Sequence, residues 1–130
     1  MDVIEVTSQR RRQLVDVTSF VQESVAAAGV GEGLCHVCVP HTTAAVTLNE
    51  NADPDVADDL LRAFEAMLPK VAWRHAEGNS DAHLLSSLVG AAVTVPISRG
   101  ELSLGRWQAV YLLELDGPRR RELRVTCLRA

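Results

Sequence analysis

Several features that define large classes of proteins are missing from this chain of 130 residues. It has no apolar run long enough to span a membrane, and no signal peptide is recognisable before the first predicted strand. Its net charge is −4, whereas proteins that bind nucleic acid usually present a basic field. We therefore expect no membrane and no nucleic acid among its partners, and we expect the cytoplasm as its compartment.

Cysteine is scarce, with three residues: Cys35, Cys38 and Cys127. Cys35 and Cys38 have the C-x-x-C spacing, but they lie in an apolar segment typical of a strand, where residues three apart point to opposite faces. There is no second cysteine pair. The sequence therefore favours buried strand cysteines over a zinc ribbon, a C-x-x-C redox motif or a disulfide scaffold.

A length of 130 residues is enough for one domain, which we expect to span residues 1–130. Apolar residues make up 47% of the chain and charged residues 23%, which is ordinary for a globular protein. Alternating and β-branched segments predict strands at 3–7, 13–18, 34–39, 44–48, 91–97, 101–104, 107–115 and 122–128. Capping residues and apolar stripes predict helices from a cap at 18 or 19 to 28, at 53–68 and at 82–89. This order predicts an α+β fold, a single two-layer domain with helices packed on one face of an antiparallel-rich mixed β-sheet.

The first candidate functional segment places His41, Thr42 and Thr43 between two strand-like runs. Scaffolds usually present chemistry at such element ends. Asn49 and Glu50 end the following strand, which spans roughly 20 Å. One chain therefore keeps His41 and Glu50 apart, whereas a neighbouring subunit could bring them together. The alternatives are simple β-propensity for the threonines and a turn histidine bonded to backbone for His41.

The second candidate segment places His75, Asn79 and His83 four residues apart, which would put them on one face of a helix. Gly78 and a Ser80–Asp81 cap argue instead for a loop up to Asn79 and a helix with His83 in its first turn. Free N–H groups and a positive dipole end favour a bound phosphate or carboxylate at such a helix start. Asn79, Ser80 and His83 are therefore candidate contacts of an anion.

Together, His41, His75 and His83 could form a three-histidine, zinc-type site with an open coordination position. The chain has no H-E-x-x-H or D-x-D motif, and chance clustering of the histidines is the alternative. The fourth histidine, His36, lies inside an apolar run and is expected outside the site.

The penultimate predicted strand carries Gln108 and Glu114 at positions of the same parity, so both face one side, which we expect to be buried. Buried polar side chains need partners, so these two would support a site from beneath or pair across a subunit interface. Arg119 begins the second of two arginine triplets, 10–12 and 119–121. Each triplet is either a solvated surface or a phosphate clamp.

Four groups of residues resemble, in order and spacing, motifs of the YjbQ-like family: 40–45, 49–50, 78–84 with 88–90, and 104–108 with 116–119. The resemblance covers nearly the whole chain. Members of this family are named secondary thiamine-phosphate synthase enzymes, so the resemblance implies a compact α+β domain, a homotrimer and a reaction that joins a pyrimidine diphosphate to a thiazole phosphate. The family pattern points to His41, Asn49, Glu50, His75, Asn79, His83, Gln108 and Glu114.

The leading hypothesis is thus a small homotrimeric enzyme acting on a phosphorylated small molecule. Its candidate catalytic residues are His41, Glu50, His75 and His83, and its candidate substrate contacts are Thr42, Thr43, Asn49, Asn79, Ser80, Gln108 and Arg119. A divalent metal, Zn²⁺ or Mg²⁺, is the candidate cofactor, held by His41, His75 and His83. Release of pyrophosphate normally uses Mg²⁺ on clustered carboxylates, and the chain has no such cluster. The alternatives are a metal-dependent hydrolase and a non-catalytic binding protein for a phosphorylated metabolite.

Overall fold

Strands dominate the computed structural model, which describes all residues from Met1 to Ala130. The elements in order are β1 (Asp2–Thr7), β2 (Gln13–Asp16), α1 (Thr18–Ala28), β3 (Gly33–Cys38), β4 (Ala44–Glu50), α2 (Pro54–Met67), α3 (Ser80–Val89), β5 (Ala92–Ser98), β6 (Glu101–Leu102), β7 (Gln108–Glu114) and β8 (Arg120–Arg129).

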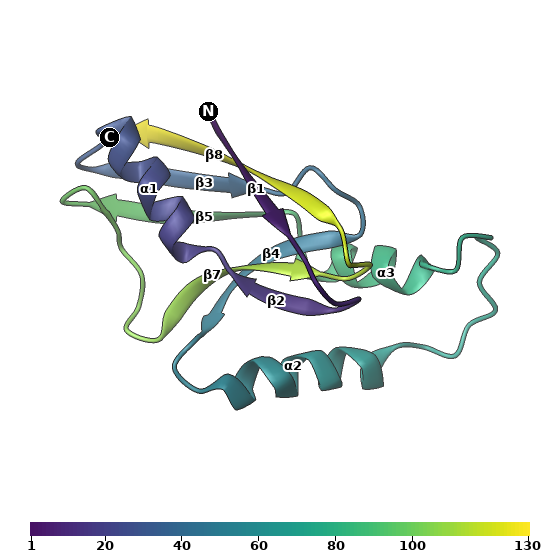
Figure 1. Cartoon of the computed structure of the whole chain (residues 1–130). Coiled ribbons are helices and arrows are strands. Elements are labelled where there is room, and N and C mark those ends of the chain that lie inside the picture. Colours follow the sequence, from purple (N-terminus) through teal and green to yellow (C-terminus); the bar gives the residue numbers. More distant parts are fainter.

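Every strand pair is antiparallel. The strands form a five-stranded sheet with the order β1-β8-β3-β5-β6 and a three-stranded sheet with the order β2-β7-β4. Helix α1 packs against strands of both sheets, α3 packs against β4, and α2 packs against β2 (Figure 1). The predicted single α+β domain is confirmed, and the structure adds that its strands are divided between two sheets.

Strand β7 is buried on both faces, which explains its nearly unbroken apolar sequence. Val110 and Leu112 belong to the main core, together with Val21 of α1. Leu113 belongs to a smaller core formed with α2 and α3, which includes Leu85 of α3. Each fully buried side chain of this size contributes about 1.5–3 kcal/mol to folding. β7 therefore joins the two cores and fixes the three-stranded sheet between them.

The helix starts follow local signals in the sequence. Asp53 caps α2 with its side chain, and Pro54 is the first helical residue. The N–H and the hydroxyl of Thr18 both donate to Asp16, so α1 begins at Thr18 and β2 ends earlier than predicted. No helix of the structure combines the length and the apolar character needed to cross a membrane.

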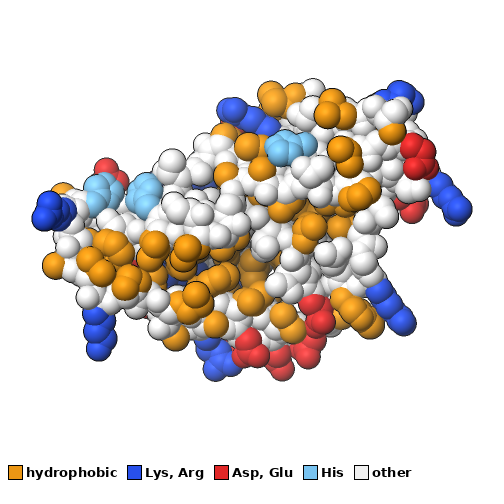
Figure 2. Space-filling model, turned by 180° about the vertical axis from the view of Figure 1, so that it is seen from behind, with side chains coloured by type: hydrophobic (Ala, Val, Ile, Leu, Met, Phe, Trp, Pro, Cys, Tyr) orange, Lys and Arg blue, Asp and Glu red, His pale blue; other side chains and the backbone are white.

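Helix α2 has no fully buried side chain, although its sequence is amphipathic. Leu61 and Phe64 cover the smaller core but stay partly exposed. At and beyond the end of the helix, Met67, Val71 and Trp73 are 65%, 52% and 45% exposed. Hydrophobic side chains are also open on the reverse face of the molecule (Figure 2). Where exposed apolar side chains gather into a patch, they are typical of a contact region for another chain.

Gly33 lies where β3 and β8 approach each other closely. A Cβ atom at this position would collide with the backbone carbonyl of Leu128 on β8. Gly33→Ala should therefore lower the free energy of unfolding by about 1–3 kcal/mol, the range for overpacked sites. Gly31→Ala is the matched control, because a Cβ there meets nothing within 4 Å. Chemical denaturation measures both variants, and equal stabilities would contradict the tight contact between these strands.

Candidate functional site

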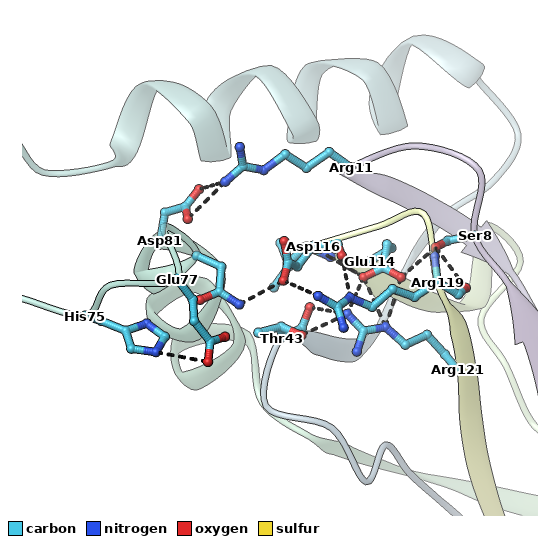
Figure 3. Close-up of polar contacts among 12 residues, drawn as sticks. Ser8, Arg11, Thr43, His75, Glu77, Asp81, Glu114, Asp116, Arg119 and Arg121 are labelled. Carbon is cyan, nitrogen blue, oxygen red and sulfur yellow. Dashed lines mark hydrogen bonds and ion pairs between the residues drawn. The ribbon is translucent and has the colours of Figure 1, made fainter. Parts of the chain in front are cut away.

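A fully buried ion pair joins Glu114, at the end of β7, to Arg121, near the start of β8. Arg121 Nε lies 2.9 Å from Glu114 Oε1, and Arg121 Nη2 lies 2.5 Å from Oε2. Ser8 donates its hydroxyl to Oε1 at 2.6 Å, and the N–H groups of Leu115 and Asp116 donate to Oε2. The convergence of Ser8, Glu114 and Arg121 is visible in Figure 3. Both carboxylate oxygens are thus hydrogen-bonded, as a buried charge requires.

Burial alone would raise the pKa of Glu114, but hydrogen bonds from Arg121, Ser8 and the Asp116 N–H hold that pKa below its ordinary value. The folded protein therefore keeps the carboxylate ionised at pH values where the unfolded chain already binds a proton. The pair stabilises the fold above the ordinary glutamate pKa, and this contribution is lost as the pH falls through the folded value.

Arg121 also holds the loop that carries the first candidate site residues. Its Nη2 donates to both the carbonyl and the hydroxyl oxygen of Thr43, each at 2.9 Å. The next residue of β8, Glu122, donates its N–H to Nε2 of His41 at 2.9 Å. Two successive residues of one strand therefore fix His41 and Thr43.

The contact with Glu122 determines how His41 can act. Because Nε2 accepts a hydrogen bond, the neutral ring carries its proton on Nδ1. Burial, and then the charge of Arg121, lowers the pKa of His41. His41 is therefore a neutral ring near pH 7, and its Nδ1–H is the group left to donate to a ligand.

His41 and His83 line one cavity of about 540 Å³. Its walls come from the loop before β4, from α3 and from the turn after α3: His41, Thr42, His83, Ser86, Ser87, Gly90 and Ala91. The ring of His75 meets that of His83 edge to face, with ring centroids 5.6 Å apart. His36 lies on β3, where it contacts Thr94, and takes no part in the cavity. The structure thus brings three of the four histidines into one region.

The start of α3 differs from the predicted capping arrangement. The Ser80–Asp81 cap was wrong: the helix begins at Ser80, and no side chain caps it. The carboxylate of Asp81 instead pairs with Arg11 at 3.1 Å (Figure 3). It also pairs with Arg12. Two guanidinium groups from the loop before β2 bind this carboxylate in place of a local N–H. Two of the three arginines of the first triplet are thus engaged in ion pairs with Asp81.

Asn79, Ser80 and Arg119 gather at this helix start rather than in the walls of the cavity. Asn79 is buried and donates its Nδ2 to Asp116 at 2.8 Å. Arg119 donates to the same carboxylate at 2.9 Å. Burial on its own would raise the pKa of Asp116, but Asn79 and Arg119 hold it below the usual range. The Oδ1 atom of Asn79 is buried without a hydrogen-bond partner.

Asn49 and Glu50 lie at the far end of β4 from His41. The strand has seven residues, so its ends are separated by roughly 20 Å. Glu50 pairs in register with Gln108, the first residue of β7. The expected burial of Gln108 was wrong: it is exposed because β7 leaves the core at that end, and its Oε1 accepts the Gly105 N–H at 2.8 Å. None of the three residues lines the histidine cavity of its own chain.

The histidines of one chain do not fit a three-histidine metal site. No three His, Cys, Asp or Glu side chains gather closely enough to hold one ion. His75 and His83 are adjacent, but Nε2 of His41 is occupied by the Glu122 N–H. An ion bound at these histidines would therefore need a ligand from another chain.

Arg121 is the site-building residue that the sequence reading missed. It lies at the end of the second arginine triplet, for which the sequence indicates either a solvated surface or a phosphate clamp. Its burial could have been inferred from strand alternation. Arg121 lies two and four residues before Leu123 and Val125, on the face of β8 that is buried at all three positions.

Fold and cavity together define a small α+β protein with a histidine-lined pocket. The chain belongs to the UPF0047 protein YjbQ-like family, whose model matches residues 2–130. It is 44% identical over 123 residues to a UPF0047 protein of Methanocaldococcus jannaschii, covering 93% of this chain and 88% of that protein. It is 41% identical over 126 residues to UPF0047 protein YugU of Bacillus subtilis, covering 93% of each.

Solved structures support the same assignment. An uncharacterized conserved protein of the YjbQ/UPF0047 family from Clostridium acetobutylicum matches with a TM-score of 0.95 at 41% identity, covering 98% of this chain and 100% of that one. A conserved hypothetical protein from Thermus thermophilus matches with a TM-score of 0.90 at 41% identity and the same coverage. The family is therefore established.

Removal of Arg121 would leave the charge of Glu114 buried without a partner. Arg121→Met should lower the free energy of unfolding by about 3–5 kcal/mol, the range for breaking a buried ion pair. Arg120→Met, at the exposed neighbouring position, is the matched control. Adding Glu114→Gln to Arg121→Met should recover part of the loss, because no charge then stays buried. Denaturant unfolding at neutral pH measures all three, and equal small losses for Arg121→Met and Arg120→Met would refute the role of the pair.

Proposed function

We propose that this protein is an enzyme that binds a phosphorylated small molecule in the cavity between His41 and His83. One observation carries the proposal: a loop and a helix distant in sequence place two imidazoles on one polar cavity, with His75 beside them. Imidazoles donate hydrogen bonds to phosphate oxygens and move protons near neutral pH. The cavity volume of about 540 Å³ suits a small-molecule site.

The three histidines would have different roles. His41 supplies a fixed donor, because the Glu122 N–H holds its ring and leaves Nδ1–H for a phosphate oxygen. Thr42, exposed beside it, adds a hydroxyl donor. The rings of His83 and His75 touch each other and reach solvent, so they can carry a proton between substrate and water.

We further propose the reaction that the family resemblance implies, the joining of a pyrimidine diphosphate to a thiazole phosphate with release of pyrophosphate. Negative charge grows on the pyrophosphate as it leaves, and preorganised N–H donors stabilise such charge. The start of α3 offers matching contacts about one turn from His83. Ser80 and Arg119 can donate to a phosphate, and the buried Asn79 positions Arg119 through the Asp116 carboxylate that both contact.

A homotrimer would complete this site, with Asn49, Glu50 and Gln108 of one chain placed against His41 of the next. The length of β4, which separates these groups within one chain, supports this arrangement. The apolar surface at the end of α2, with Trp73 45% exposed, supports self-association. A neighbouring chain would also be the source of the missing ligand for a divalent metal, Zn²⁺ or Mg²⁺.

The activity is tested by supplying the purified protein with the pyrimidine diphosphate and the thiazole phosphate and measuring thiamine phosphate and pyrophosphate. His83→Ala should lower kcat/KM by about tenfold or more and should weaken binding of inorganic phosphate, because a charge-assisted hydrogen bond is worth about 1.5–3 kcal/mol. His36→Ala is the control, since His36 contacts Thr94 on the neighbouring strand outside the cavity.

The outcomes separate the hypotheses. Absence of product with both substrates would reject the synthase reaction. If no product forms but His83→Ala loses phosphate binding and His36→Ala keeps it, the cavity is still supported as a phosphate site. Calorimetric titration with Zn²⁺ tests the metal-dependent hydrolase: zinc bound by the wild type and lost in His83→Ala would assign the histidines to a metal. Unchanged phosphate and zinc binding would remove His83 from both.

The shared site predicts a particular pattern of complementation. Light scattering should give three times the chain mass of 14.1 kDa. His41→Ala and Glu50→Gln should each be inactive alone, yet mixed trimers of the two should regain activity, because some interfaces then hold both native residues. A monomer mass at micromolar concentration, or no recovery in mixed trimers, would contradict a site built from two chains.

A further inference from the structure

We propose that Cys35 and Cys127 form an oxidisable pair, in which a hydroperoxide converts the two thiols into a disulfide between β3 and β8. The two residues are direct partners in the antiparallel register of these strands. Both thiols are free. Neither residue lines the histidine cavity, so this modification site is separate from the proposed function.

The hydrogen bonds between the two strands indicate how close the side chains lie. Antiparallel partners alternate between hydrogen-bonded and non-hydrogen-bonded pairs. The N–H of Ala130 donates to the carbonyl of Glu32 at 3.0 Å, and these two residues continue the same register. Counting inward from this hydrogen-bonded pair places Cys35 and Cys127 at a non-hydrogen-bonded position.

Partners at such positions hold their Cα atoms about 4.5 Å apart and bring their side chains closest. A disulfide needs Cα atoms about 4.4–6.8 Å apart. The pairing of β3 with β5 leads to the same conclusion. The Val39 N–H donates to the Ala91 carbonyl at 2.7 Å, and in that register the backbone N–H and C=O of Cys35 point to β5 and not to β8. The bond can therefore form without breaking any backbone hydrogen bond.

The two thiols differ in access. Cys127 is partly exposed and lines a cavity of about 300 Å³ beside α1, together with Met1, Asp2 and Ser24. Cys35 is fully buried, and burial, with the neighbouring Cys127 thiol, raises the pKa of Cys35 to about 12. A small oxidant therefore meets Cys127 first, and Cys35 acts as the resolving thiol.

The chemistry has two steps. The Cys127 thiol releases its proton to solvent, and its thiolate attacks one oxygen of the hydroperoxide. The O–O bond breaks, the leaving alkoxide or hydroxide takes up a proton equal to the one released and becomes an alcohol or water, and Cys127 becomes a sulfenic acid. The sulfur of Cys35 then attacks the sulfur of Cys127, the S–O bond breaks, and the departing hydroxide takes the thiol proton and leaves as water. The two thiols lose two electrons, which reduce the peroxide.

The position of the pair gives the disulfide a structural consequence. β3 runs on into the loop that carries His41, and β8 carries near its start Arg121 and Glu122, which hold that loop. A bond between Cys35 and Cys127 would tie these two strands together. Oxidation should therefore make the protein more resistant to unfolding.

The test treats the full-length protein with hydrogen peroxide and follows its intact mass and its peptide map. The wild type and Cys38→Ala should lose the mass of two hydrogen atoms and yield a linked peptide that contains Cys35 and Cys127. Cys38 is the matched control because it points to the opposite face of β3 from Cys35. The melting temperature of the oxidised wild type should rise by several degrees, and a thiol reductant should reverse the rise.

Cys127→Ala, at the partly exposed position, should give neither the linked peptide nor the rise in melting temperature. Three results would overturn the proposal: addition of oxygen to Cys127 without a link to Cys35, a disulfide that includes Cys38, or no change in the mass of the wild type. Because the wild-type reaction decides the matter, a folding defect in a variant cannot obscure it.

Discussion

The buried pairing of Glu114 with Arg121 is the constraint on which the rest of the structure depends. It joins residues from four separate segments, since Ser8 and Thr43 complete its hydrogen bonds. Such a pair adds little net stability compared with apolar side chains, but it tolerates only one arrangement of the strands around it. Because β7 and β8 belong to different sheets, the pair fixes how the two sheets meet at the β7–β8 connection, and any other arrangement there would leave one of the two charges buried alone. The position of the loop with His41 follows from this pair, because Arg121 and the next residue of β8 hold that loop.

The sequence predicted those features that local chemistry determines. The Asp53–Pro54 start of α2, the alternation of β3 and the apolar run of β7 are properties of neighbouring residues, and each element was found where its pattern placed it. The missed features all involve partners distant in sequence. Arg121 was hidden in a charged triplet because its partner is on another strand, and Asp81 looked like a cap because its arginines precede β2. The exposure of Gln108 depends on where the core ends, which strand parity cannot indicate.

The candidate site residues divide into two groups at opposite ends of β4. His41, His75 and His83 form one group, and Asn49, Glu50 and Gln108 form the other. A strand is a rigid spacer, so no side-chain movement within one chain can close this gap. The histidine group offers hydrogen-bond donors and the other group offers a carboxylate and amides. The two groups are thus complementary in chemistry. Surfaces that meet between copies of one chain are expected to have this property.

The placement of β8 between β1 and β3 has a consequence for the rate of folding. β8 is an inner strand, and both of its neighbours lie far from it in the sequence: Val125 pairs with Asp2 on one side and with Val37 on the other. Until β8 docks, β1 and β3 have no common partner, and the carboxylate of Glu114 has no guanidinium. The chain must close these long loops before the contacts of β8 offset the lost entropy, and long-range strand pairing of this kind makes folding slow. The edges of β1 and β3 that face β8 therefore stay open to other chains for most of the folding reaction.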